Sequence, residues 1–121
     1  MSARSRNKGA SGEREVVRLL REHLPQWEWE RSCQASVRGG LSRPDIFPVE
    51  GPTWLWHVEV KRYGERLPGA LRTLHARAQA DAGEYRAVLV HRLDGEQWRC
   101  TWWHEGELVT KAFAAWAEVA R

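Results

Sequence analysis

Two acids and a lysine, Asp45, Glu59 and Lys61, stand in segments whose other residues are typical of buried strands. Period-two alternation places Glu59 and Lys61 on the same face of their strand. Asp45 stands near the start of the preceding strand, so a hairpin through the turn at residues 50–52 would bring its carboxylate beside that of Glu59. Two adjacent carboxylates repel each other at neutral pH unless a cation or a proton lies between them. The spacing therefore predicts a site for a divalent metal ion.

A third acid, Glu13, stands on an amphipathic helix that is predicted over residues 10–25 and ends at Pro25. The apolar stripe of this helix consists of Val16, Val17, Leu20 and Leu24. Glu13 falls on the same stripe, where an unpaired charge facing a sheet would be costly, so we expect it to join the other two acids at the cation. Glu15 lies roughly 200° around the helix from Glu13 and is predicted to be a solvated partner of nearby arginines.

Alternating helix and strand patterns surround these residues and must position them. Helices are predicted over residues 10–25, 67–83 and 110–120, and strands over 26–32, 44–49, 53–63, 85–93 and 97–106. The segment 33–43, rich in serine, glycine and arginine, is predicted to be a flexible loop. This order predicts an α/β fold with a mixed central β-sheet of about five strands flanked by helices. A chain of 121 residues can bury one core, so we expect a single domain over 1–121.

Positive charge is concentrated in two stretches of a chain whose Lys and Arg outnumber Asp and Glu by 19 to 16. Residues 1–10 carry Arg4, Arg6 and Lys8 without an acid, and are predicted to form a basic, mobile arm. Residues 61–77 carry one acid, Glu65, among five Lys or Arg. Patches of this kind permit a polyanionic partner. Because no run of about 18 apolar residues and no apolar leader segment is present, we expect a cytoplasmic protein without a membrane partner.

The segments Pro44-Asp45 and Glu59-Val60-Lys61 together resemble the signature of the PD-(D/E)xK nucleases. More narrowly, the chain is similar to the archaeal-type Holliday junction resolvases. That likeness rests on the block "RNKGASGERE" from Arg6 to Glu15, on Arg31-Ser32 at the end of the first strand, and on the spacing of the acids. It covers roughly the first two thirds of the chain, and it implies a restriction-endonuclease-like fold.

The resemblance also implies roles for individual residues. Glu13, Asp45 and Glu59 would hold Mg²⁺ with the carbonyl of Val60, and Mn²⁺ would serve as a substitute. Lys61 would position the attacking water or stabilise the phosphorane-like transition state, which completes a catalytic set of Glu13, Asp45, Glu59 and Lys61. The residues predicted to contact DNA are Arg4, Arg6, Lys8, Arg14, Arg31, Ser32, Arg38, Arg43 and Arg62.

The implied function is Mg²⁺-dependent hydrolysis of phosphodiester bonds in branched DNA, four-way junctions above all. A junction must be cut at two symmetry-related phosphates, so we expect a homodimer. Two alternatives stay open. One is a PD-(D/E)xK nuclease that acts on another DNA substrate, of repair or restriction type. The other is a catalytically silent DNA-binding module of the same fold, which would bind DNA without cutting it.

Eight tryptophans dominate the aromatic residues. Those of the predicted strands alternate as core residues should, namely Trp27, Trp29, Trp54 and Trp56. Trp102 and Trp103 are adjacent on one predicted strand and cannot both face inward. One of the two is a candidate for a subunit interface or for stacking on DNA, and the sequence does not decide which.

Overall fold

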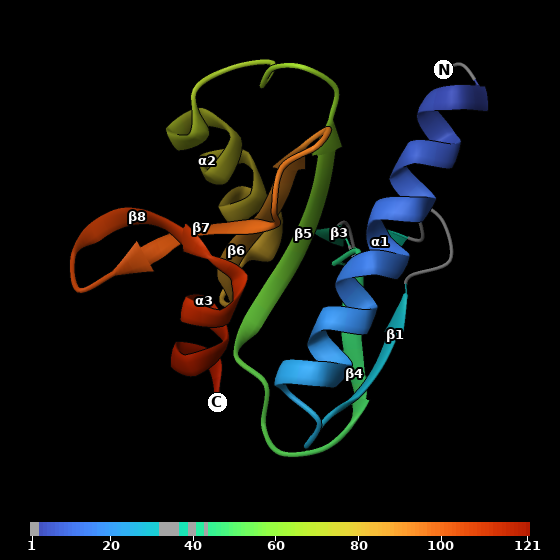
Figure 1. Cartoon of the computed structure of the whole chain (residues 1–121). Coiled ribbons are helices and arrows are strands. Elements are labelled where there is room, and N and C mark those ends of the chain that lie inside the picture. Colours follow the sequence, from blue (N-terminus) through green and yellow to red (C-terminus); the bar gives the residue numbers. More distant parts are fainter. Residues whose placement is uncertain (1–2, 32–36, 39–40, 43) are drawn as a thin grey trace.

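A mixed β-sheet of six strands forms the centre of the structure, a computed structural model that describes residues 3–31, 37–38, 41–42 and 44–121 (Figure 1). Of residues 3–9, 37–38 and 41–42, it describes the backbone alone. The strands stand in the order β1 (Glu28–Arg31), β4 (Ile46–Glu50), β5 (Trp56–Tyr63), β6 (Arg86–Leu93), β7 (Arg99–His104) and β8 (Glu107–Ala112). β5 and β6 are parallel, and the other neighbouring pairs are antiparallel. Two short strands, β2 (Val37–Arg38) and β3 (Leu41–Ser42), pair with each other outside this sheet.

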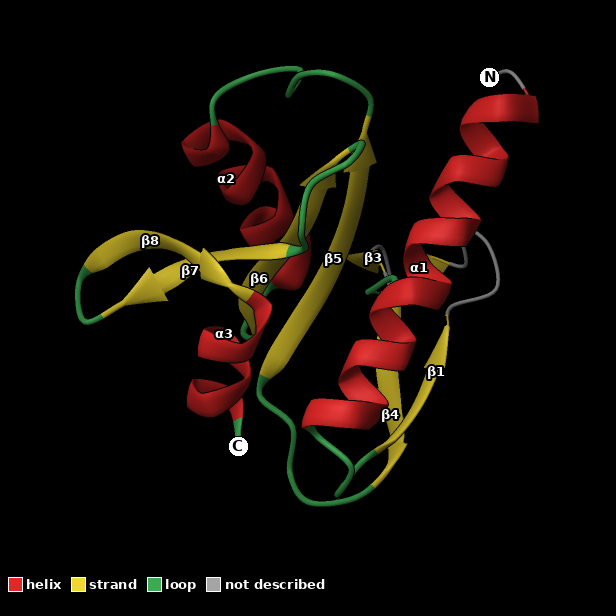
Figure 2. Ribbon diagram, viewed as in Figure 1, coloured by secondary structure: helices red, strands yellow, loops and turns green. Residues whose placement is uncertain are grey.

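Helices cover both faces of the sheet (Figure 2). α1 (Ala3–His23) and α3 (Phe113–Ala120) lie on one face, where Val16 and Trp116 belong to the same buried cluster as Val58. α2 (Leu71–Ala82) makes the crossover from β5 to β6, because parallel neighbours cannot be joined by a tight hairpin. No helix in the described part of the chain is long and apolar enough to cross a lipid bilayer. The predicted α/β fold with a mixed sheet between helices is confirmed.

Alternation along β5 assigns its side chains to the two faces of the sheet. Trp56, Val58 and Val60 are buried in the cluster beneath α1 and α3. Glu59 and Lys61 point to the opposite face, where they line a groove together with residues of α2. The sequence prediction that Glu59 and Lys61 share a face is therefore confirmed.

The predicted hairpin between β4 and β5 is present, and its strands diverge soon after they meet. Ile46 pairs with Val58 as the register partner of the two strands, and the backbone N–H of Asp45 donates to the carbonyl of Val58 at 3.1 Å. At the turn, Gly51 has a φ of +133°, and a Cβ there would lie 2.5 Å from Cδ1 of Trp27. Only glycine fits this close approach, which fixes the hairpin against Trp27.

The five tryptophans at 27, 29, 54, 56 and 116 pack together, with ring centroids 4.8–6.1 Å apart. The prediction that the strand tryptophans belong to the core is confirmed, although Trp54 packs at the margin of the cluster. The structure also shows which of the adjacent Trp102 and Trp103 faces inward. Trp102 is 1% exposed and belongs to the core, whereas Trp103 is 44% exposed.

Three predictions about the elements are wrong. The first helix, predicted to begin at residue 10, begins at Ala3, since Ala, Arg and Lys favour helix and carry α1 through Gly9. Residues 33–43, predicted as a loop, contain the strands β2 and β3. A sixth strand, β8, takes residues that were predicted to begin the last helix, which starts at Phe113 instead. The missed signal is Glu105-Gly106, whose positive φ values of 51° and 83° make a two-residue turn between β7 and β8.

Candidate active site

Asp45 and Glu59 lie beside each other where β4 and β5 begin to diverge. Asp45 precedes β4, and its Oδ2 accepts a hydrogen bond from the backbone N–H of Val60 at 2.8 Å. Together with its own N–H bond to Val58, this contact fixes the carboxylate of Asp45 against the middle of β5. The sequence prediction that the hairpin brings the two carboxylates together agrees with this arrangement.

The two carboxyl groups differ in their affinity for a proton. Burial and the charge of Glu59 raise the pKa of Asp45 to about 7, and the charge of Glu13 adds to the shift, although the Val60 N–H opposes it. Burial also raises the pKa of Glu59, but His57, Lys61 and a hydrogen bond with Asp45 outweigh it, so that the pKa falls below its ordinary value. At neutral pH Glu59 is therefore ionised while Asp45 is close to half protonated, which marks a local deficit of positive charge.

Lys61 stands next to this pair, with its Nζ 3.5 Å from Oε1 of Glu59. Burial lowers the pKa of Lys61, but the charges of Glu59 and Asp45 outweigh it and leave the pKa above its ordinary value. The ammonium group therefore stays protonated at neutral pH and can donate hydrogen bonds to an anion.

His57 is a contact of the site that sequence reasoning missed. Its Nε2 lies 3.4 Å from Oε2 of Glu59, and its side chain is 3% exposed. The available signal was its position two residues before Glu59 on the same face of the strand, but a lone histidine at such a position is more often a neighbour than a participant. In the structure His57 contacts one oxygen of the Glu59 carboxylate and Lys61 contacts the other, so that both residues of the strand orient this carboxylate.

Glu13 approaches the pair from α1 and is engaged by an arginine. Its Oε1 lies 3.4 Å from Nε of Arg31 at the end of β1, and its charge still contributes to the raised pKa of Asp45. Within the described ranges, no three His, Cys, Asp or Glu side chains converge closely enough to hold a metal ion as they stand. The donors available to a cation are thus the Asp45–Glu59 pair, with Glu13 nearby and turned to Arg31.

The chemistry of this donor set fits a hard divalent cation. Carboxylate and carbonyl oxygens are the ligands that Mg²⁺ prefers. The raised pKa of Asp45 reports the repulsion that such a cation would relieve. A set of three carboxylates would form only if Glu13 left Arg31.

Arginines line a hollow between α1 and β1 beside Glu13. These arginines are Arg14, Arg18, Arg21 and Arg31. The sequence prediction named Arg14 and Arg31 as DNA contacts, and the structure places both in this hollow. Arg18 and Arg21, which were not among the predicted contacts, line the same hollow, since their spacing from Arg14 puts the three on one side of a helix. The hollow offers several guanidinium groups to a polyanion.

Arg62, also predicted to contact DNA, lies in an ion-pair network instead. Its Nη1 lies 3.4 Å from Oε2 of Glu15, and its Nε lies 3.5 Å from Oδ1 of Asp94. Glu15 also contacts Nη2 of Arg92 at 3.3 Å. Glu15 was predicted to be a solvated partner of nearby arginines; its pairing with arginines is confirmed, but its side chain is only 34% exposed, because Arg62 and Arg92 come from the strands β5 and β6. A phosphate at Arg62 would have to compete with two carboxylates.

The remaining predicted DNA contacts cannot be placed. Ser32 and Arg43 lie outside the described residues. The side chains of Arg4, Arg6, Lys8 and Arg38 also lie outside the described part of the structure.

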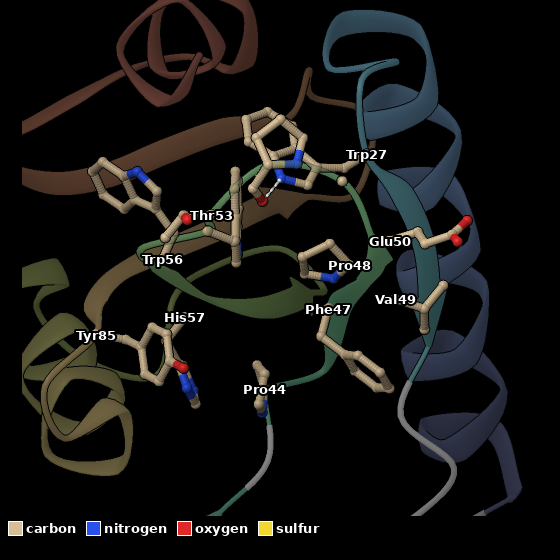
Figure 3. A pocket seen from close by; sticks show the side chains of 13 residues that line it. Trp27, Pro44, Phe47, Pro48, Val49, Glu50, Thr53, Trp56, His57 and Tyr85 are labelled. Carbon is tan, nitrogen blue, oxygen red and sulfur yellow. Dashed lines mark hydrogen bonds between the residues drawn. The ribbon is translucent and has the colours of Figure 1, made fainter.

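A larger hollow, of about 580 Å³, lies next to the site on the side of Pro44 and His57 (Figure 3). Tryptophans, prolines, Phe47 and Tyr85 supply most of its lining. Its rim is exposed, with Val49 at 46% and Tyr85 at 54%. An apolar lining of this kind suits a protein surface better than a phosphate backbone.

The fold is similar to that of a solved structure, Hjc from Archaeoglobus fulgidus, which is a Holliday junction resolvase from an archaeal hyperthermophile. The two sequences are 21% identical, the match covers 93% of this chain and 100% of that chain, and the TM-score is 0.54. No family model and no curated protein sequence matches the chain. The predicted resemblance is therefore confirmed at the level of the fold, which this chain shares with a Holliday junction resolvase.

Proposed function

We propose that this chain is a Mg²⁺-dependent endonuclease that resolves four-way DNA junctions by paired hydrolysis of phosphodiester bonds. The observation that carries the proposal is the Asp45–Glu59 pair, in which one carboxyl has a pKa of about 7 beside an ionised neighbour and a protonated lysine. Such a cluster in a fold shared with a junction resolvase supports cation-dependent phosphoryl chemistry.

In this proposal Asp45, Glu59 and the Val60 carbonyl hold Mg²⁺, for which Mn²⁺ can substitute. The bound ion supplies positive charge to the dianionic transition state and acidifies the attacking water. Asp45 is preorganised by the Val60 N–H, and His57 holds Glu59 in its orientation. Lys61 donates a hydrogen bond to the water or to the phosphoryl oxygen from a position 3.5 Å from Glu59.

DNA is bound in the proposal through phosphates at the arginine-lined hollow between α1 and β1. The predicted basic residues Arg4, Arg6 and Lys8 add affinity that does not depend on base sequence. Arg31 has two roles in the proposal, because it is a phosphate contact and also forms an ion pair with Glu13 in the structure. A DNA phosphate is an anion that competes for Arg31, and binding it would free Glu13 to join the cation site.

The proposal is tested by cleavage of a labelled synthetic four-way junction beside linear duplex of the same sequence, each with Mg²⁺ and with EDTA. We expect symmetric nicks that appear on the junction alone and require Mg²⁺. Equal cutting of the duplex would keep the nuclease but favour another substrate of repair or restriction type. Tight, salt-sensitive binding without any cutting would instead favour a silent DNA-binding module.

We further propose that the chain acts as a homodimer, because two symmetry-related phosphates must be cut. The apolar hollow with its exposed rim at Val49 and Tyr85 is the face that we assign to the second copy. Tyr85→Glu is expected to convert a dimer into a folded monomer at micromolar concentration. Sedimentation velocity measures this, and a wild-type chain that sediments as a monomer would contradict the proposal.

A further inference from the structure

A groove of about 380 Å³ runs between β5 and α2, and Glu59 of the candidate active site is one of its lining residues. Three side chains on one face of β5 line it in succession, Glu59, Lys61 and Tyr63. The wall on α2 carries two charged residues, Arg77 and Asp81. The floor is apolar and consists mainly of Leu74, Ala78 and Leu89. Neither Tyr63 nor Arg77 has a part in the proposed chemistry described above.

The spacing along β5 matches the repeat of a nucleic-acid strand. Lys61 and Tyr63 are two residues apart on one face, which separates them by about 6.6 Å along the strand. Consecutive phosphates of a DNA strand lie at a similar separation. If Lys61 faces the phosphate that is cut, Tyr63 therefore faces the neighbouring phosphate.

The chemical state of Tyr63 suits a hydrogen-bond donor to an anion. Burial raises the pKa of Tyr63, and the charge of Glu59 adds to this, whereas Lys61 and Arg77 oppose it. The phenol therefore keeps its proton at neutral pH. Lys61 and Arg77 line the groove together with Tyr63, and both cations would attract a phosphate oxygen.

Arg77 is available for a ligand. Its side chain is exposed, and among the described residues it forms no ion pair within 4 Å, although it stands one helical turn from Asp81. Asp81 lies toward the Glu59 end of the wall, because α2 runs back antiparallel to β5, so the favourable position for a phosphate lies away from it, between Tyr63 and Arg77.

We infer that Tyr63 and Arg77 bind the backbone phosphate next to the one that is cut, and so position the strand at Lys61 and the carboxylate pair. The inference rests on the proposed nuclease function and adds two positioning residues to it. The ligand is the phosphodiester backbone, not a base, because three donors line the groove, two of them cationic, namely Lys61, Tyr63 and Arg77.

The test compares Arg77→Gln with Arg72→Gln, a matched control on the same helix whose exposed side chain does not line the groove. With EDTA present, the slope of log affinity against log salt for the junction is expected to become less steep by about 0.9 for Arg77→Gln, the loss of one phosphate contact. With Mg²⁺, kcat/KM is expected to fall about tenfold for Arg77→Gln and for Tyr63→Phe. Arg77→Lys should recover part of the loss, and Arg72→Gln should behave as wild type.

A junction with a single neutral methylphosphonate identifies the phosphate. Placed next to the cut position, the substitution is expected to weaken binding by the wild type and to have a clearly smaller effect on Arg77→Gln, in which Tyr63 is the remaining contact. Additive losses, or an Arg77→Gln variant equal to Arg72→Gln while the wild type cuts junctions, would overturn the inference and leave the proposed function standing. A wild-type chain that cuts no DNA would overturn both.

Discussion

Replacing Glu59 with glutamine is expected to lower junction cleavage in Mg²⁺ by about a thousandfold, while junction binding in EDTA stays within about twofold of wild type. Glutamine keeps the size of the side chain and can still accept a hydrogen bond from His57, whose Nε2 lies 3.4 Å away. It removes the ionised carboxylate whose charge raises the pKa of Lys61 and would attract the proposed cation. The loss should therefore appear in the chemical step, which single-turnover cleavage of a labelled junction measures.

A matched control for this variant is Glu65→Gln, which neutralises an exposed acid in the segment directly after β5. It changes net charge by the same amount and should leave the cleavage rate unchanged. If Glu59→Gln and Glu65→Gln cut at the wild-type rate, the assignment of the site to β5 is wrong. If both bind the junction more tightly than wild type, the effect is one of general charge and not of the site.

Replacing Asp45 with asparagine is expected to stabilise the cation-free protein at alkaline pH. The pKa of Asp45 is raised from 3.8 to about 7 by burial and by Glu59, so its ionisation opposes folding. The contribution that the protonated Asp45 makes to the stability of the wild type is fully present below about pH 4 and is lost as the pH rises through about 7. The full difference corresponds to at most about 4 kcal/mol. Asparagine is neutral and keeps an oxygen for the Val60 N–H, so the variant avoids this loss.

Urea unfolding in EDTA at several pH values measures this effect. The free energy of unfolding of Asp45→Asn should exceed that of wild type at pH 8, and the difference should nearly vanish at pH 4. His91 changes the free energy of unfolding in the opposite direction with pH. Burial and Arg99 lower the pKa of His91 to about 4, so its contribution to stability is lost as the pH falls below 6.5. Since His91 is present in both proteins, its contribution cancels from the comparison.

Added Mg²⁺ gives the same variant a second readout that does not depend on activity. At pH 8 the cation should raise the unfolding midpoint of wild type and have a much smaller effect on Asp45→Asn. An Asp45→Asn protein that is less stable than wild type at pH 8 in EDTA would show that the carboxylate is not under electrostatic strain. The pH profile then measures the cost of burying the charge of Asp45, and the Mg²⁺ response measures its role as a cation ligand.

The meeting of Asp45 with Glu59 could be predicted from the sequence because both of its causes are local. Alternation fixes which face Glu59 occupies, and a turn at residues 50–52 fixes which neighbour it meets. Glu13 was predicted from the apolar stripe of its helix, and its charge indeed acts on Asp45. Its pairing with Arg31 was not predicted, because that contact depends on how α1 lies across β1.

The contacts that sequence reasoning missed depend on how elements cross in space. Glu15 was expected to pair with arginines in solvent, and it does pair with arginines, but a helical wheel does not show that these are Arg62 and Arg92 of the sheet, which leave its side chain 34% exposed. His57 contacts Glu59 because β5 is an interior strand and its side chains have little freedom to turn away. The groove beside α2 was also beyond prediction, since the approach of α2 to β5 follows from the crossover to β6.

The packing of five tryptophans between the sheet and α3 has an optical consequence. Their rings meet at centroid separations of 4.8–6.1 Å, mostly at steep angles, so the electronic transitions of neighbouring indoles are coupled. Coupled indoles produce exciton bands of both signs in the far-ultraviolet circular dichroism spectrum, superimposed on the signal of the backbone. A helix content deduced from that spectrum by standard reference sets will therefore be in error for this protein, and the aromatic bands themselves will report whether the core is intact.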